Sequence, residues 1–219
     1  MTTPALAHLQ TDPILAQIIA ETPIIKPATS LTDADLGTHG TDRLYLVLMK
    51  SIVSQQISVK AADAIFRRFR MLFSETADAE GYPSPTQLLQ KTTDELRAAG
   101  LSFQKITYLQ SVATFALANP LTTAHVAQMT DEEVVQYLLQ IKGVGRWTVE
   151  MLLMFALERP DVFPDYDLVI RQKMVRAYQL TETGKPLYRR LQEIAATWQP
   201  HRTLACRYLW RWTPSVTAS

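Results

Sequence analysis

The sequence is poor in cysteine and glycine and has no long hydrophobic run. Its 219 residues include one cysteine, which excludes an internal disulfide framework, a four-cysteine zinc site and an iron–sulfur cluster. The longest apolar run, from Met151 to Leu157, has seven residues, far below the ~18 that a membrane helix needs. The first residues lack the basic start and apolar core of a signal peptide, so we expect a cytoplasmic protein with no membrane partner.

The formal net charge of +1 hides an uneven distribution of charged residues. From Arg171 onwards nine basic residues stand against two acidic ones, a net charge of +7, whereas the first 170 residues carry −6. Such a basic end can form a surface for an anion, including nucleic acid. The alternative is a set of solvated helix faces, and charge alone does not decide between the two.

Capping residues and helical spacing of apolar residues predict an all-α fold. Asp12-Pro13 is typical of a helix start, and Thr92 with Glu95 and Thr130 with Glu133 form two capping boxes. No alternating apolar run with hairpin turns is long enough to predict a sheet. We expect about ten helices, over residues 14–20, 44–53, 61–72, 92–100, 103–117, 130–139, 146–157, 169–178, 186–196 and 200–212. Residues 20–40 and 160–167 are interpreted as irregular connections.

The most specific segment runs from Leu138 to Glu150, where one amphipathic helix meets the next through Gly143-Val144-Gly145. Glycine adopts backbone angles closed to other residues and has no side chain to block a close approach. We expect Val144 to fill the space between the two helices. The backbone amides of Gly145, Arg146 and Trp147 would then point out of a helix N-terminus, which suits a phosphate of nucleic acid. An ordinary glycine turn between helices is the alternative.

A second feature follows 22 residues after Gly145, where Asp167 precedes the helix expected from Val169. An aspartate at this position can simply cap the helix N-terminus. It can also present a carboxylate to a cleft beneath the hairpin, and this is the functional interpretation.

Together, these motifs resemble the helix-hairpin-helix DNA glycosylase superfamily, and within it the DNA-3-methyladenine glycosylase II branch. The resemblance covers roughly Leu44 to Trp212 and rests on four motifs in the family's order. They are Ser51-Ile52-Val53-Ser54-Gln55-Gln56-Ile57-Ser58-Val59-Lys60-Ala61-Ala62, Ile141-Lys142-Gly143-Val144-Gly145-Arg146-Trp147-Thr148, Asp167-Leu168-Val169-Ile170-Arg171-Gln172, and Trp198-Gln199-Pro200-His201-Arg202, which leads to Leu209-Trp210.

The resemblance implies an enzyme that flips a damaged base out of double-stranded DNA and hydrolyses its N-glycosidic bond, in base excision repair. Asp167 would be the catalytic carboxylate, with Asp165 as the competitor. Members of the superfamily that also cut the DNA backbone carry a lysine where this chain has Trp147. We therefore expect a monofunctional enzyme that acts on alkylated bases such as 3-methyladenine and 7-methylguanine and leaves an abasic site.

Further site residues follow from the same resemblance. Trp147 and Trp210 would line the base pocket, where aromatic faces attract a cationic base. Met151 and Leu168 stand where the better-known branch has tyrosines, which predicts a wider, less aromatic pocket. The loop Gln55-Gln56-Ile57 would supply the wedge that fills the hole left by the flipped base. Cations that can reach phosphates are Lys60, Arg171, Lys173, Arg202 and Arg207.

The resemblance also predicts two helical lobes with the active site in a cleft between them. One would span residues 42–158, and the other would combine 1–41 with 159–219. No metal held by side chains is expected, although a structural ion on the hairpin's backbone carbonyls fits the family. We expect a monomer, associated with the nucleoid through DNA. Three alternatives stay open: a glycosylase for oxidised or deaminated bases, a non-catalytic DNA-binding module with the same hairpin, and a structural helical domain with no DNA role.

Overall fold

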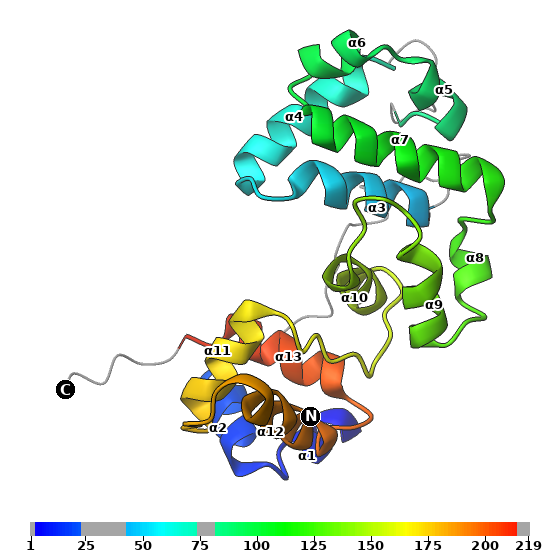
Figure 1. Cartoon of the computed structure of the whole chain (residues 1–219). Helices are drawn as coiled ribbons and strands as arrows, with labels where there is room; N and C mark the ends of the chain where they lie inside the picture. Colours follow the sequence, from blue (N-terminus) through cyan, green and yellow to red (C-terminus); the bar gives the residue numbers. More distant parts are fainter. Residues whose placement is uncertain (1–2, 23–42, 74–81, 214–219) are drawn as a thin grey trace. The chain divides into compact units, whose positions relative to one another are not determined.

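The computed structural model describes residues 3–22, 43–73 and 82–213, and within them every regular element is a helix (Figure 1). The predicted all-α class is therefore confirmed. The chain divides into two compact units, one formed by residues 1–29 with 153–219 and the other by residues 30–152. The expected lobes span residues 42–158 and residues 1–41 with 159–219. That they are independent domains stays a prediction.

The unit formed by residues 30–152, called here the hairpin unit, is built around a long central helix. The helices are α3 (Arg43–Ser54), α4 (Val59–Met71), α5 (Pro85–Gln90), α6 (Thr93–Ala98), α7 (Phe103–Ala118), α8 (Thr123–Val126), α9 (Asp131–Leu138) and the start of α10 (Arg146–Phe155). Helix α7 packs against α3, α5 and α6, and α3 also packs against α4. Fully buried Leu48, Ile52, Leu109 and Val112 on α3 and α7 contribute to the core of this unit.

The other unit, called here the carboxylate unit, joins the beginning of the chain to its end. It contains α1 (Pro4–Leu9), α2 (Pro13–Glu21), α11 (Leu168–Ala177), α12 (Gly184–Ala196) and α13 (Arg202–Arg211), with the last turn of α10. Helix α13 packs against both α11 and α2. Buried Trp198, Met174 and Leu209 contribute to the core of this unit.

Asp12 joins the beginning of the chain to the carboxyl-terminal helices. Its Oδ1 caps α2 by accepting hydrogen bonds from the amides of Ile14 and Leu15. Its Oδ2 accepts hydrogen bonds from the Tyr178 hydroxyl at 2.5 Å and from the Trp198 indole Nε1 at 3.1 Å. Burial, together with the Asp12 carboxylate, raises the pKa of Tyr178 above its ordinary range.

We expect Tyr178→Phe to lower the free energy of unfolding by about 2 kcal/mol, because it removes a hydrogen bond to a charged, partly buried acceptor. Thermal or denaturant unfolding measures this change. Tyr188→Phe is the matched control, since no hydrogen bond of its hydroxyl occurs within the described residues, and its effect should stay within about 0.5 kcal/mol. Equal effects of the two substitutions would contradict the role given to Asp12.

Helix starts follow the local signals in the sequence. Thr92 with Glu95 and Thr130 with Glu133 form the capping boxes that the sequence predicts. The bond from the Thr92 amide, aided by Lys91, lowers the pKa of Glu95 to about 2. Three short helices, α1, α5 and α8, are absent from the sequence prediction. A third capping box, Ser84 with Gln87, opens α5, and this signal could have revealed that helix.

Candidate active site

The predicted hairpin joins α9 to α10. The Val144 amide donates to the Ile141 carbonyl at 3.0 Å, which closes a tight turn, and the Lys142 amide donates to the Ser111 hydroxyl of α7 at 3.1 Å. Val144 is buried, as expected for a residue that fills the space at the hairpin. The turn therefore sits on α7, and α10 begins directly after it.

The two hairpin glycines have different roles. Gly143 has φ +93°, and a Cβ added there would lie 2.2 Å from Cγ of the Tyr108 ring. Gly145 has no positive φ, and an added Cβ would meet no atom within 4 Å. Only Gly143 therefore uses the backbone freedom of glycine. At Gly145 the missing side chain leaves open space at the start of α10.

Arg146 is the first residue of α10, and its side chain binds two glutamates of the same unit. Its guanidinium forms ion pairs with Glu132 at 2.9 Å and with buried Glu150 at 3.1 Å. The bond to Glu132 raises the pKa of Arg146, and the same bond lowers the pKa of Glu132. An anion at this hairpin would therefore meet backbone amides at the helix N-terminus first, where the helix dipole favours negative charge.

The predicted wedge loop follows α3 and is tied to the hairpin. Gln56 has φ +58° and is exposed, and the Ile57 side chain is 37% exposed. The Gln55 side chain instead donates from Nε2 to the Gly143 carbonyl at 3.2 Å. From α7, the Lys105 ammonium donates to the Val53 carbonyl at 2.6 Å, and burial lowers the pKa of Lys105. Gln55 therefore ties the wedge loop to the hairpin, and Lys105 ties the end of α3 to α7. The sequence analysis missed both contacts because the partners are distant in sequence.

Asp167 caps α11 and is 7% exposed. Its Oδ1 accepts a hydrogen bond from the Ile170 amide at 2.8 Å and another from the Trp210 indole Nε1 at 3.1 Å. Asp165, the competing carboxylate, accepts a hydrogen bond from Gln192 of α12 at 3.1 Å. Two directed donors, one from the backbone and one from a side chain, thus set the orientation of the Asp167 carboxylate.

Trp210 is in turn held from two sides. Its ring contacts Phe155 with centroids 5.6 Å apart, and its carbonyl accepts a hydrogen bond from Lys173 at 2.6 Å. The sequence predicts Trp210 as a wall of the base pocket but gives no sign that its N–H donates to Asp167. A donor of this kind is found only by knowing how α13 packs on α11.

The other predicted pocket residues fall in both units. Trp147 (48% exposed) and partly buried Met151 lie on α10 in the hairpin unit, whereas Leu168 (59% exposed) lies beside Asp167 in the carboxylate unit. Their grouping into one base pocket stays a prediction.

Most of the cations proposed for phosphates have partners within the protein. Arg202 binds both carboxylate oxygens of Asp161, at 2.8 and 2.9 Å. Lys173 holds the end of α13, and burial lowers its pKa. The Arg171 guanidinium lies 4.7 Å from the centroid of the Tyr188 ring. Burial lowers the pKa of Arg207, whereas Lys60 is exposed.

Neither a side-chain metal cluster nor a membrane-spanning helix is found among residues 3–22, 43–73 and 82–213. The hairpin carbonyls of Ile141 and Gly143 already accept hydrogen bonds from Val144 and Gln55. A structural ion on these carbonyls stays a prediction, and no chemical step below depends on it.

Comparisons with known proteins agree on one family. The family described as HhH-GPD superfamily base excision DNA repair protein matches residues 49–200. DNA-3-methyladenine glycosylase 1 of Schizosaccharomyces pombe is 38% identical over 169 residues, which cover 76% of this chain and 71% of the yeast protein. A putative DNA-3-methyladenine glycosylase of Bacillus subtilis is 31% identical, and the match spans 58% of its length.

Solved structures give the same result. The 3-methyladenine DNA glycosylase of Schizosaccharomyces pombe in complex with abasic DNA superposes with a TM-score of 0.71 at 30% identity, covering 95% of each chain. A DNA-3-methyladenine glycosidase of Bacillus halodurans superposes with a TM-score of 0.75 at 30% identity, covering 95% of this chain and 88% of the other.

Proposed function

Because the chain belongs to the HhH-GPD superfamily of base excision DNA repair proteins, we propose that it is a glycosylase that removes alkylated bases from double-stranded DNA. The named relatives support this substrate class, since those reported above are 3-methyladenine glycosylases. We include 3-methyladenine and 7-methylguanine among its substrates. We also propose that it acts as a monomer, associated with the nucleoid through DNA.

The orientation of Asp167 is the observation that carries this proposal. A carboxylate that served only as a helix cap would need the Ile170 amide alone, yet Asp167 also accepts the Trp210 indole N–H. Breaking the bond between the base nitrogen and C1′ leaves positive charge on the sugar, and a nearby carboxylate stabilises that charge. The bonding electrons go to the base, and a water molecule adds its oxygen to C1′. Asp167 accepts the proton that this water loses.

A purine alkylated at N3 or N7, such as 3-methyladenine or 7-methylguanine, needs no separate general acid. It carries a positive charge before the bond breaks, so it leaves as a neutral base without being protonated. A single carboxylate is therefore enough for this class of damage. The residue after Gly-Val-Gly-Arg is Trp147, which has no amine to attack the sugar, so the product is an intact strand with an abasic site.

The hairpin unit supplies DNA binding in this proposal. The amides at Gly145 and Arg146 bind a phosphate, and the open space at Gly145 lets that phosphate approach. Gln56, exposed at the loop tip, enters the stack in place of the flipped nucleotide. In the carboxylate unit, Trp210 stacks on the cationic base and Leu168 lines the pocket beside Asp167.

We expect Trp210→Phe to lower the single-turnover rate of base release by about 10- to 100-fold, since a hydrogen bond to a charged group contributes about 1.5–3 kcal/mol. DNA affinity should change little. Trp212→Phe is the matched control, because the Trp212 indole donates to exposed Glu21 rather than to Asp167. Equal rates for the two variants would remove Trp210 as a positioning residue.

The proposed function is tested by incubating the protein with methylated duplex DNA and measuring free bases by chromatography. Strand integrity is measured in parallel, before and after alkali treatment. The proposal predicts released methylated bases and strands that break only after alkali. DNA binding without base release would favour the non-catalytic module, and strand breakage without alkali would contradict the monofunctional assignment.

A further inference from the structure

Helix α12 presents three faces to different surroundings. Leu191, Ile194 and Ala195 are buried in the core of the carboxylate unit. Tyr188 and Gln192 contact the segment that carries Asp167. Lys185 and Arg189 lie four residues apart and form a third face. This face borders the second one, because residues three or four apart are neighbours on a helix surface and Lys185 is three residues before Tyr188.

The face formed by Tyr188 and Gln192 packs directly on the segment around Asp167. The Tyr188 ring lies 5.5 Å from the Tyr166 ring, and the Arg171 guanidinium lies 4.7 Å from the Tyr188 centroid. The Gln192 amide donates to Asp165 at 3.1 Å. Lys185 and Arg189 are therefore held beside the loop that presents the candidate catalytic carboxylate.

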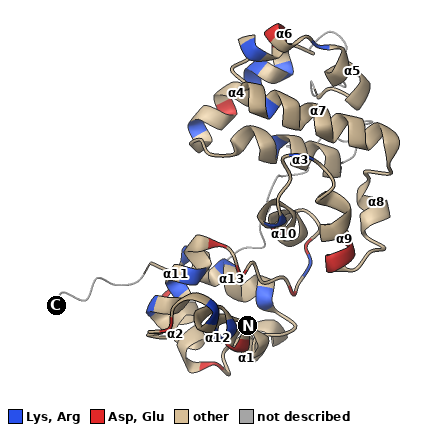
Figure 2. Ribbon diagram, viewed as in Figure 1, with Lys and Arg blue, Asp and Glu red and all other residues tan. Residues whose placement is uncertain are grey.

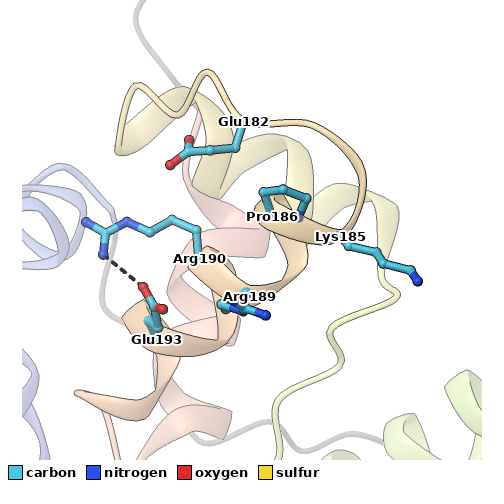
Figure 3. A pocket seen from close by; sticks show the side chains of 6 residues that line it. All are labelled: Glu182, Lys185, Pro186, Arg189, Arg190 and Glu193. Atoms are coloured by element: carbon cyan, nitrogen blue, oxygen red, sulfur yellow. Dashed lines mark hydrogen bonds and ion pairs between the residues drawn. The ribbon is translucent and has the colours of Figure 1, made fainter.

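Lys185 and Arg189 are exposed, and no hydrogen bond or ion pair of either side chain occurs in the part of the chain that the structure describes. Their neighbour Arg190 differs, since it pairs with Glu193 at 3.2 Å. Lys185 and Arg189 line a hollow of about 320 Å³ together with Glu182, Pro186, Arg190 and Glu193. In Figure 3, Lys185 extends away from the Arg190–Glu193 pair. Two like charges at this spacing repel each other, and a bound anion removes that repulsion.

The surroundings favour nucleic acid as the source of the anion. Figure 2 shows Lys and Arg on α11, which Asp167 caps, and on α12, which contacts Tyr166 and Asp165. Tyr166 is 63% exposed and Leu168 is 59% exposed on either side of Asp167, and exposed aromatic and apolar groups beside cations are typical of surfaces for nucleic acid. Binding to an acidic protein surface would not explain why Lys185 and Arg189 lie next to the loop that carries Asp167.

We propose that Lys185 and Arg189 contact phosphates of the DNA strand whose nucleotide reaches Asp167. This inference rests on the proposed function and adds a second backbone contact, independent of the hairpin. Each phosphate contact on duplex DNA contributes about 0.9 to the slope of log affinity against log salt concentration.

The test compares Lys185→Gln/Arg189→Gln with the wild type for binding to duplex DNA containing an abasic site, over a range of salt concentrations. The expected result is weaker binding and a slope reduced in magnitude by about 1.8. Arg190→Gln is the control, because it removes one positive charge, against two in the double variant, from the same helix at a residue that is already paired with Glu193. Its slope should equal that of the wild type. Thermal unfolding of each variant confirms that α12 stays folded.

An unchanged slope in the double variant would overturn the inference. A slope reduced by about 0.9 in Arg190→Gln would overturn it too, because it would indicate a general charge effect. Base release from methylated DNA is measured on the same samples. A failure of the phosphate contact can then be distinguished from a failure of the proposed glycosylase function. If the wild type releases methylated bases and the slope of the double variant is unchanged, only this inference fails. If the slope changes but the wild type releases nothing, the phosphate contact stands and the proposed enzymatic function fails.

Discussion

Asp167→Asn is expected to lower the single-turnover rate of base release by about 10²–10⁴-fold. Asparagine keeps an oxygen that can accept the bonds from Ile170 and Trp210, and it caps helices as well as aspartate does. The fold and DNA affinity should therefore stay near those of the wild type. Only the negative charge and the proton-accepting ability are lost, and these are the properties that the mechanism requires.

Asp165→Asn is the control for this substitution. Asparagine can still accept the hydrogen bond from Gln192, so the loop should keep its position and the rate should stay within a few-fold of wild type. Rates are measured with enzyme in excess over a duplex containing one alkylated base. If Asp165→Asn strongly lowers the rate of base release and Asp167→Asn leaves it normal, Asp165 is the catalytic carboxylate instead of Asp167.

Gly143→Ala is expected to abolish DNA binding and to destabilise the hairpin unit. The left-handed backbone costs about 1–2 kcal/mol for a residue with a side chain, and crowding a packed site adds about 1–3 kcal/mol. Both apply here, because φ is +93° and the added Cβ would lie within 2.6 Å of three atoms of the Tyr108 ring. Relief of the clash would move the hairpin away from α7. Denaturant unfolding and DNA-binding titrations measure the two effects.

Gly145→Ala separates stability from binding. An added Cβ at Gly145 meets nothing within 4 Å, so stability should change by less than about 0.5 kcal/mol. The same methyl group would occupy space that the proposal gives to a phosphate, and DNA affinity should fall. Normal affinity in Gly145→Ala would show that no ligand approaches the hairpin at this residue, and normal stability in Gly143→Ala would contradict the close packing on Tyr108.

The helices were predictable where their signals are local. A cap such as Asp12 or Thr130 and the apolar spacing that follows it lie within a few residues, so sequence alone locates the start of the helix. The short helices α1, α5 and α8 have four to six residues, too few to show a periodic pattern. The predicted connection over residues 20–40 lies almost entirely outside the described residues, so its structure stays a prediction.

The roles of individual site residues were harder to predict because they depend on contacts between distant segments. Asp167 and the hairpin were identified from their motifs. The donation from Trp210 to Asp167 joins residues 43 apart in sequence, and the donation from Gln55 to Gly143 joins residues 88 apart. Arg146 matched the motif, yet its side chain binds two glutamates that no short pattern links to it.

Base release from a set of duplexes that differ in one nucleotide tests the central claim most directly. Each duplex carries one 7-methylguanine, 3-methyladenine, 8-oxoguanine or uracil, and the free base is quantified for the wild type and for Asp167→Asn. The account predicts release of the two alkylated bases by the wild type, little release of the other two, and loss of release in the variant. Release of only 8-oxoguanine or uracil, or equal release by both proteins, would contradict it.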